Sequence, residues 1–352
     1  MLSRLRGYIT RHRRKFIVAG ILVGGTFLII KYAQRKLIEI QQQQAREFVE
    51  KTRRMQHFES TERTCNQVII GMSAELCAAI IRECSTDELL EKLRQQPDNK
   101  LELWEEMKIV AFTRLTTYIY ASSMLVVTLR LQMNLLGGYL YKDIVTDQQQ
   151  ITDEVKQNYL SLIRHFIHEG GLTELANLIR TKVSSIFKPL PLTKRLNLPD
   201  IEQLFYSLQM SINSDAGDPN SRMAIFLLPG ELPLYSTTLP VLERMYSDTL
   251  DLLESDDASV VSSQNISRGF SLAVDAIAES LSETVRLTAN PLNINTVEIA
   301  LAKIIPIVSG LTSKGFDNTS RPQNLATSLI TFYLISEKTK MFGANVYETF
   351  CS

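Results

Sequence analysis

The chain has 352 residues, and its 38 lysines and arginines equal its 38 aspartates and glutamates, so the formal net charge is zero. This balance provides no global field that would attract nucleic acid, and any charged partner has to be recognised locally. The four cysteines form no CxxC pair, and only four histidines accompany them. This pattern argues against a zinc site and favours free thiols in a reducing compartment, and we expect no metal and no cofactor.

An uncharged apolar run, FIVAGILVGGTFLII, occupies residues 16–30. Basic side chains flank it on both sides, at Arg11, Arg13, Arg14 and Lys15 before the run and at Lys31, Arg35 and Lys36 after it. As a helix the run covers about 22 Å, less than a ~30 Å hydrocarbon core, but snorkelling lysine and arginine side chains close that difference. Because no small-residue cleavage pattern follows, we predict a membrane anchor rather than a cleaved signal sequence. The basic residues on both flanks leave its orientation open.

Glutamine and charged residues dominate the segment after the anchor, and its sparse apolar residues indicate a partly solvated helical stalk. Apolar residues then recur with helical spacing, without sustained strand-like alternation, and breaker-rich stretches predict long central loops. The sequence therefore predicts an all-α protein, an elongated helical bundle preceded by a single N-terminal transmembrane helix. Its expected parts are a basic segment (1–15), a transmembrane helix (16–32), a helical stalk (33–58) and an α-helical domain (59–352).

Residues 115–129, LTTYIYASSMLVVTL, form a second uncharged stretch, bracketed by Arg114 and Arg130. A second membrane span is one interpretation of it. The stretch is no longer than the first run, however, and its threonines, serines and tyrosines make it less apolar. We therefore predict a helix buried in the bundle. Gly137 and Gly138 continue the same apolar pattern, where we expect close helix packing.

The residue types that support catalysis do not cluster in this sequence. His165 and His168 are three apart on one predicted helix, and without a nearby cysteine or a paired carboxylate signal we interpret them as a surface pair rather than metal ligands. There is no dinucleotide-binding glycine motif after a strand, no P-loop motif and no nucleophile elbow. We therefore expect a protein that is not an enzyme.

The only tryptophan lies in the segment PDNKLELWEEMKIV, residues 97–110. Asn99 and Glu102 resemble a capping box, so a helix is predicted to start there. Lys100, Trp104, Met107 and Lys108 would then form an apolar strip with lysines beside it. Such a strip suits an amphipathic helix that carries acidic residues. The alternative interpretation is that Trp104 fills the core, as most tryptophans do.

Seven strings distributed from the stalk to the C-terminus resemble the peroxin-3 family. They are HFESTERTCN (57–66), NKLELWEEMKI (99–109), LLGGYLY (135–141), GLTEL (171–175), SRGFS (267–271), LAKIIPIVSG (301–310) and ANVYE (344–348). The basic-apolar-basic start matches as well, so the resemblance covers nearly the whole chain and is weak only around residues 187–240.

The resemblance implies an integral peroxisomal membrane protein with its N-terminus in the matrix and residues 59–352 in the cytosol. In that family the cytosolic domain docks peroxin-19, the soluble receptor and chaperone for newly made peroxisomal membrane proteins, through a helix inserted into an apolar groove. Membrane lipids and the cargo proteins carried by the receptor would be its further partners. Arg11, Arg13, Arg14 and Lys15 match the membrane-targeting segment of the family.

The resemblance also assigns individual residues to the groove. It points to Leu93, Lys100, Trp104, Leu140 and Lys303, and the helical strip adds Met107 and Lys108. A different role for the same chain is a membrane-tethered scaffold for organelle-inheritance or pexophagy adaptors. That role would use another face of the domain.

Overall fold

The structure is a computed structural model that describes residues 13–95, 98–232, 240–286, 297–313, 316 and 324–351, with helix position alone for residues 13–30 and 283–286. The chain divides into two compact units, residues 1–57 and 58–352. The helices are α2 (Arg13–Glu83), α3 (Asp87–Arg94), α4 (Lys100–Thr146), α5 (Asp153–Ser161), α6 (Arg164–His168), α7 (Gly171–Phe187), α8 (Leu198–Asn213), α9 (Met223–Leu227), α10 (Pro240–Leu253), α11 (Asp256–Arg286), α12 (Leu301–Leu311), α13 (Leu325–Ile335) and α14 (Glu337–Phe350). The all-α prediction is confirmed, because the described residues add only the two-residue strands β1 (Arg195–Leu196) and β2 (Ile299–Ala300).

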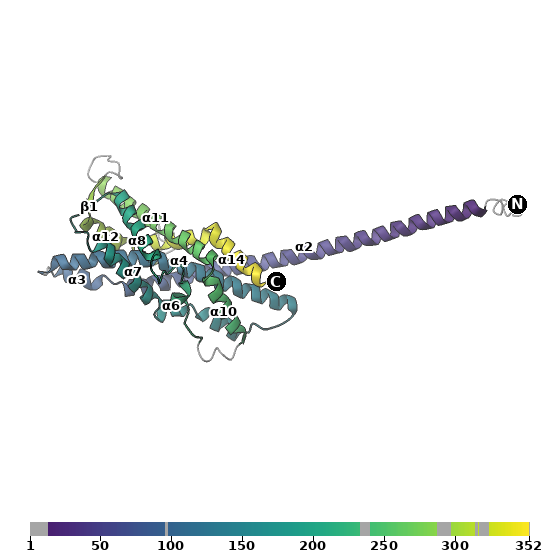
Figure 1. Cartoon of the computed structure of the whole chain (residues 1–352), viewed down its shortest axis with the longest axis horizontal. Helices are drawn as coiled ribbons and strands as arrows, with labels where there is room; N and C mark the ends of the chain where they lie inside the picture. The colour runs from purple at the N-terminus through teal and green to yellow at the C-terminus, as the bar shows by residue number, and fades with distance from the viewer. Residues whose placement is uncertain are drawn as a thin grey trace. The chain divides into compact units, whose positions relative to one another are not determined.

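Helix α4 is the core of the second unit. It contains 47 residues and so is about 70 Å long. Every residue from Val110 to Gly138 is buried. In Figure 1, α7, α10, α11 and α14 lie around it, and each of these helices contacts it directly. A helix enclosed on all sides needs no polar face, which explains why residues 115–129 carry no charge.

Two described helical segments are long and apolar enough to cross a membrane, residues Lys31–Glu83 of α2 and the whole of α4. The apolar window of α4 is 94% buried inside the protein. The prediction of a buried bundle helix at residues 115–129 is therefore confirmed, because its apolar surface already contacts other helices. The N-terminal helix α2 is thus apolar enough to be a membrane span, and it also contains the apolar run 16–30.

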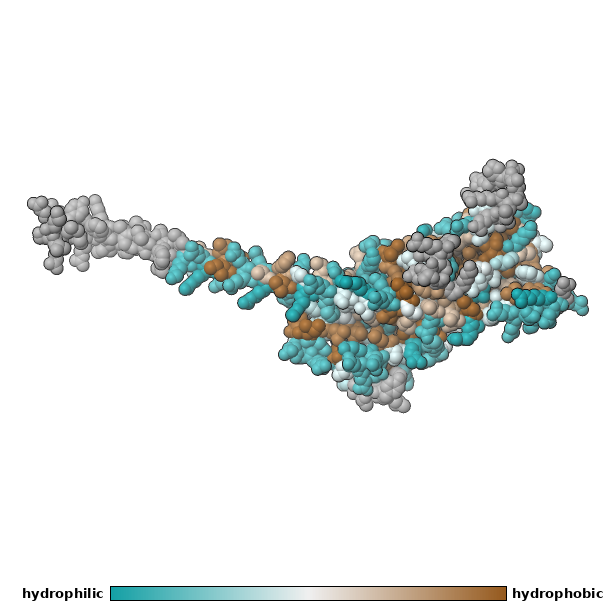
Figure 2. Space-filling view, turned by 180° about the vertical axis from the view of Figure 1, so that it is seen from behind, coloured by the Kyte–Doolittle hydropathy of each residue, from teal (hydrophilic) through white to brown (hydrophobic). Residues whose placement is uncertain are grey.

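The first unit consists of the N-terminal part of α2. Residues 31–50 are all exposed, including Phe48 at 71% and Val49 at 65%. Figure 2 shows hydrophobic residues scattered singly among hydrophilic ones along this part of the helix. Scattered apolar residues are typical of a solvated helix and do not form a continuous apolar stripe.

Three buried cysteines lie on the part of α2 that belongs to the second unit. Cys65, Cys77 and Cys84 are free thiols. Burial raises the pKa of Cys65 to about 12 and the pKa values of Cys77 and Cys84 to about 11. These side chains therefore stay protonated and pack as small apolar groups.

Adjacent glycines let two helices approach α4 closely. A Cβ atom added to Gly137 would lie 2.7 Å from Thr61 Cγ2 on α2. A Cβ atom added to Gly138 would lie 2.8 Å from Phe350 Cβ and 3.0 Å from the backbone carbon of Phe350 on α14. The prediction of close helix packing at this glycine pair is thus confirmed.

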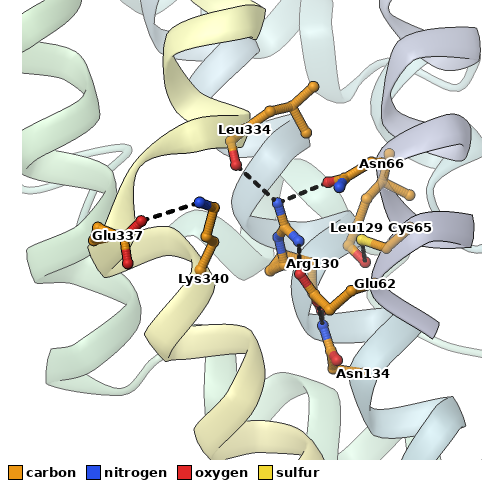
Figure 3. Close-up of polar contacts among 9 residues, drawn as sticks. All are labelled: Glu62, Cys65, Asn66, Leu129, Arg130, Asn134, Leu334, Glu337 and Lys340. Atoms are coloured by element: carbon orange, nitrogen blue, oxygen red, sulfur yellow. Dashed lines mark hydrogen bonds and ion pairs between the residues drawn. The ribbon is translucent and has the colours of Figure 1, made fainter. Parts of the chain in front are cut away.

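A buried polar network joins α4 to α2 and α13 (Figure 3). The Arg130 side chain is fully buried and pairs with Glu62, while its Nη2 also donates to Asn66 Oδ1 at 3.0 Å and to the Leu334 carbonyl at 3.4 Å. Asn134 Nδ2 donates to the other Glu62 oxygen at 2.8 Å. The charge of Arg130 is therefore balanced inside the bundle, as a buried charge has to be.

Helix α12 is held against α4 by its apolar face and by its N-terminus. Leu301, Ile304, Ile305 and Val308 are buried. The Leu301 and Ala302 amides donate to the carbonyls of Lys194 and Leu192, and β1 pairs antiparallel with β2 just before the helix. These bonds set where α12 begins beside α4.

Candidate docking cleft

Helices α3 and α12 form the two walls of a cleft whose floor is the first part of α4. We call it the α3–α12 cleft, and it has a volume of about 380 Å³. Its lining residues are Ile81, Thr86, Asp87, Leu90, Trp104, Met107, Arg114, Ile305, Pro306, Ser309, Gly310 and Ser313. Apolar side chains with a few convergent polar groups are the usual composition of a recognition site.

The floor of the cleft depends on where α4 begins. The helix starts at Lys100 with Asn99 as its N-cap, as predicted, but the Asn99 side chain makes no capping hydrogen bond, so the expected capping box is wrong. Trp104 follows one turn later and is partly buried against the core. Met107 is 2% exposed and lies one further turn along. Trp104 therefore fills part of the core and still presents a face to the cleft, which combines the two alternatives for this residue.

The first wall is the short amphipathic helix α3. Leu89 is buried and attaches α3 to the core, while Leu90 on the next position is 40% exposed and lines the cleft. Leu93 is partly buried and packs against the same core one turn later. The hydroxyl of Thr86, the N-cap residue of α3, does not cap the helix.

The second wall is α12, and it contains a proline. Pro306 lies inside the helix and has no amide hydrogen to donate to the previous turn. Ile305 and Pro306 supply the apolar part of this wall, and Ser309 supplies the polar part.

Among the described residues that line the cleft, the cation is Arg114 on the floor, and it is 3% exposed. Its Nε donates to Thr312 Oγ1 at 2.8 Å, its Nη1 to Thr86 Oγ1 at 3.2 Å, and its Nη2 to the Ser309 carbonyl at 2.8 Å and hydroxyl at 3.1 Å. Burial lowers the pKa of Arg114, and the negative charge of Asp87 opposes that shift.

The structure brings most of the predicted groove residues to this end of the second unit. Trp104 and Met107 line the cleft, and Leu93 lies on the helix that forms its first wall. Lys100 is exposed at the start of α4, and Lys303 is exposed on α12.

Two predicted groove residues, Lys108 and Leu140, do not line the α3–α12 cleft. The Lys108 side chain is fully buried, and its Nζ donates to Glu105 Oε2 at 2.5 Å and to the Leu190 carbonyl at 2.7 Å, so it is not offered to a partner. Leu140 lies about 54 Å further along α4 than Trp104 at 1.5 Å per residue. It therefore belongs to the opposite end of the helix.

The predicted targeting residues fall mostly outside what the structure describes. Arg11 lies outside the described residues. Arg13, Arg14 and Lys15 lie in the first turn of α2, with helix position alone described.

Sequence reasoning missed Arg114, Leu90, and the Thr86, Ser309 and Thr312 hydroxyls. One signal was available for Arg114, because it directly precedes an uncharged stretch predicted to be buried. A charged residue at that place needs partners, but the sequence does not say which ones.

A second hollow, of about 240 Å³, has a different character. Its charged lining residues are Arg82, Glu83, Glu88, Lys92, Glu106 and Arg180, so cations and carboxylates balance. All six are exposed. This balance gives no preference for one class of ligand.

The described residues contain no group of three or more histidine, cysteine, aspartate or glutamate side chains placed to hold a metal ion. His168 Nε2 contacts Glu75 Oε1 at 2.8 Å, and His165 Nδ1 lies 3.7 Å from Glu169 Oε2. The two histidines thus contact different carboxylates. The fold and the cleft define an all-α protein with an N-terminal helix apolar enough to span a membrane and with a largely apolar cleft on its second unit.

Comparison with known proteins identifies the family. The Peroxin-3 family profile matches residues 7–101, 95–150 and 141–347. The chain is 35% identical over 371 residues to Peroxisomal biogenesis factor 3 of Rattus norvegicus, covering 99% of this chain and 98% of the relative. It is 35% identical over 374 residues to the Homo sapiens protein of the same name, with the same coverage. Peroxisome biogenesis protein 3-2 of Arabidopsis thaliana is 23% identical over 256 residues, which are 66% of this chain and 70% of the relative.

The chain belongs to the peroxin-3 family. This membership and the apolar N-terminal helix support a peroxisomal membrane protein with a role in peroxisome biogenesis and membrane protein targeting. That role is not an enzymatic one.

Proposed function

We propose that this chain is the docking factor for peroxin-19 at the peroxisomal membrane. An amphipathic helix of the receptor inserts into the α3–α12 cleft and buries its apolar side chains against Trp104, Met107 and Leu90. The receptor then releases its cargo, a newly made membrane protein, at the membrane.

One observation carries the proposal. The α3–α12 cleft places Trp104, an apolar aromatic side chain, at the floor between two helical walls. A groove of this kind is the usual receptor for an amphipathic helix. Tryptophan in such a pocket is among the residue types that contribute most to binding.

Two exposed lysines, Lys100 and Lys303, supply positive charge that attracts an acidic partner to this end of the domain. Lys100 and Lys303 are exposed in the first turns of α4 and α12, four residues before Trp104 and three residues before Pro306. Positive charge at a rim accelerates association with an acidic partner more than it increases affinity. We therefore infer that acidic residues flank the apolar face of the bound helix.

The membrane topology is part of the same proposal. Residues 1–15 lie in the matrix and act as the targeting segment, through Arg11, Arg13, Arg14 and Lys15. Residues 16–32 cross the membrane, 33–58 form the stalk, and 59–352 form the cytosolic docking domain. Protease treatment of intact peroxisomes that carry the full chain tests this arrangement, since it should digest the domain and protect an N-terminal tag.

The docking proposal is tested with the fragment 41–352 and purified peroxin-19. Replacing Trp104 by alanine removes about 2 kcal/mol or more of binding energy, so Trp104→Ala should weaken the complex roughly thirtyfold or worse. The control is Met341→Ala, which removes an apolar side chain that is 61% exposed on α14 and absent from the cleft lining. Isothermal titration calorimetry measures both affinities, and circular dichroism checks that both variants are folded. Normal binding by folded Trp104→Ala would overturn the proposal.

A further inference from the structure

The guanidinium of Arg114 touches both walls of the α3–α12 cleft. One nitrogen, Nη1, reaches the Thr86 hydroxyl at the start of α3. The other two, Nε and Nη2, reach Thr312 and Ser309 at the end of α12. Since Arg114 itself is anchored on α4, a single planar group connects the floor to each wall.

The environment of this cation is unusual for a buried charge. No carboxylate lies within 4 Å of Arg114 among the residues that the structure describes, and its hydrogen-bond partners are hydroxyls and one carbonyl. The Ser309 carbonyl belongs to the last turn of α12, where carbonyl groups lack helical donors and the helix dipole is negative. Arg114 therefore caps the C-terminus of α12, which stabilises its charge in addition to the more distant carboxylate of Asp87.

The bond to Thr86 adds a polar contact to the small apolar attachment of α3, which Leu89 and the partly buried Leu93 provide. This helix has eight residues, and Leu89 is its buried side chain. The Thr86 hydroxyl would ordinarily cap the helix, but here it accepts a hydrogen bond from Arg114 instead. The position of α3 relative to α4 thus depends on the guanidinium as well as on Leu89.

We propose that Arg114 is a positioning residue that holds α3 and α12 at the separation at which the α3–α12 cleft admits a partner's amphipathic helix. The inference rests on the proposed docking function and names the residue that sets the separation of the two cleft walls. Arg114 acts through the two walls and need not contact the partner.

The test compares Arg114→Lys and Thr86→Val with the unchanged fragment 41–352. Lysine retains the positive charge but replaces the planar fork with a single nitrogen that cannot bridge both walls. Thr86→Val keeps the side-chain shape and removes only the tie to α3. Affinity for peroxin-19 is measured by calorimetry, and hydrogen exchange of the free fragment is followed element by element.

We expect Arg114→Lys to weaken binding about tenfold and to increase amide exchange in both Asp87–Arg94 and Leu301–Leu311. Thr86→Val should increase exchange in Asp87–Arg94 alone and weaken binding less. Exchange in α7 and α11 should remain unchanged in both variants, which a general loss of stability would not allow.

Three outcomes separate the positioning role of Arg114 from the proposed docking function. If both variants bind as the unchanged fragment does while Trp104→Ala binds weakly, the positioning role is overturned and the docking function stands. If exchange increases equally in α7, α11 and the two walls, Arg114 is a general stability residue and the positioning role is again overturned. If Trp104→Ala binds normally, the docking function fails, whatever Arg114→Lys does.

Discussion

Arg130 and Arg114 are both buried arginines on α4, and they are stabilised in different ways. Arg130 pairs with the carboxylate of Glu62 (Figure 3), whereas Arg114 relies on hydroxyls and on the end of α12. Removing one partner of a buried ion pair leaves the other charge without compensation, and that loss exceeds the contribution of the intact pair.

We predict that Glu62→Ala destabilises the domain by about 3 kcal/mol, because it leaves the fully buried Arg130 without its carboxylate. The matched control is Glu59→Ala, one turn earlier on α2. Glu59 and Arg63 are 58% and 77% exposed and 3.8 Å apart, so this change should cost less than about 1 kcal/mol. Urea unfolding of the fragment 41–352 measures both, and equal losses would contradict the prediction.

Some residues of the cleft can be identified from the sequence, and others cannot. Trp104 could be selected from the sequence because tryptophan is rare and its neighbours form a helical strip. Lys108 could not be excluded, because its bond to the Leu190 carbonyl joins residues 82 positions apart. Hydrogen bonds over such separations are decided by packing and leave no local pattern.

At the scale of elements, the glycine pair of α4 decides how closely its neighbours approach. The end of α14 lies so near Gly138 that an added Cβ would meet the backbone carbon of Phe350 at 3.0 Å and the Cys351 nitrogen at 3.1 Å. Backbone atoms cannot rotate away as a flexible side chain does. A side chain at residue 138 therefore has to displace α14.

We predict that Gly138→Ala destabilises the domain by about 2 kcal/mol through this overpacking. Gly71→Ala is the control on α2, because an added Cβ there has nothing within 4 Å. That change should be neutral or should stabilise the domain by up to about 1 kcal/mol, since alanine is the better helix former. Thermal unfolding measures the stability of both variants. A Gly138→Ala variant as stable as the unchanged domain would show that α14 shifts to accommodate the added methyl group.

The sequence predicted the helices well and their tertiary placement less well. Helical periodicity and the uncharged stretch 115–129 identified α4 as a buried helix. Leu140 was assigned to the groove by resemblance, yet it lies about 54 Å along α4 from Trp104. One long helix can contribute to both ends of a domain, and short sequence strings do not record at which end a residue lies.

At the scale of the whole molecule, the division between the units falls inside one continuous helix, between His57 and Phe58 of α2. The part beyond the division supplies core residues, among them Cys65, Ile69, Leu76 and Ile80, all fully buried. The part before it is exposed from Lys31 to Glu50. The same helix is thus solvated in one unit and part of the core in the other.

We predict that the fragment 41–352 is soluble and unfolds cooperatively, whereas 84–352 aggregates. The shorter fragment loses the α2 residues that cover α4 and exposes a large apolar surface. Size-exclusion chromatography and thermal circular dichroism test both fragments. Cooperative unfolding of 84–352 at the same temperature would show that α2 is dispensable for the core.

The sequence by itself determined the properties that depend on local pattern: the all-α class, the apolar N-terminal run, the buried character of residues 115–129 and the start of a helix just before Trp104. Helical periodicity and apolar length are read over a few turns, so one chain suffices to find them. Only the tertiary structure decided that Lys108 is buried, that Leu140 lies at the far end of α4, and that Arg114 joins α3 to α12. Those outcomes depend on which turns of distant helices meet, and side-chain packing across the whole domain selects that register.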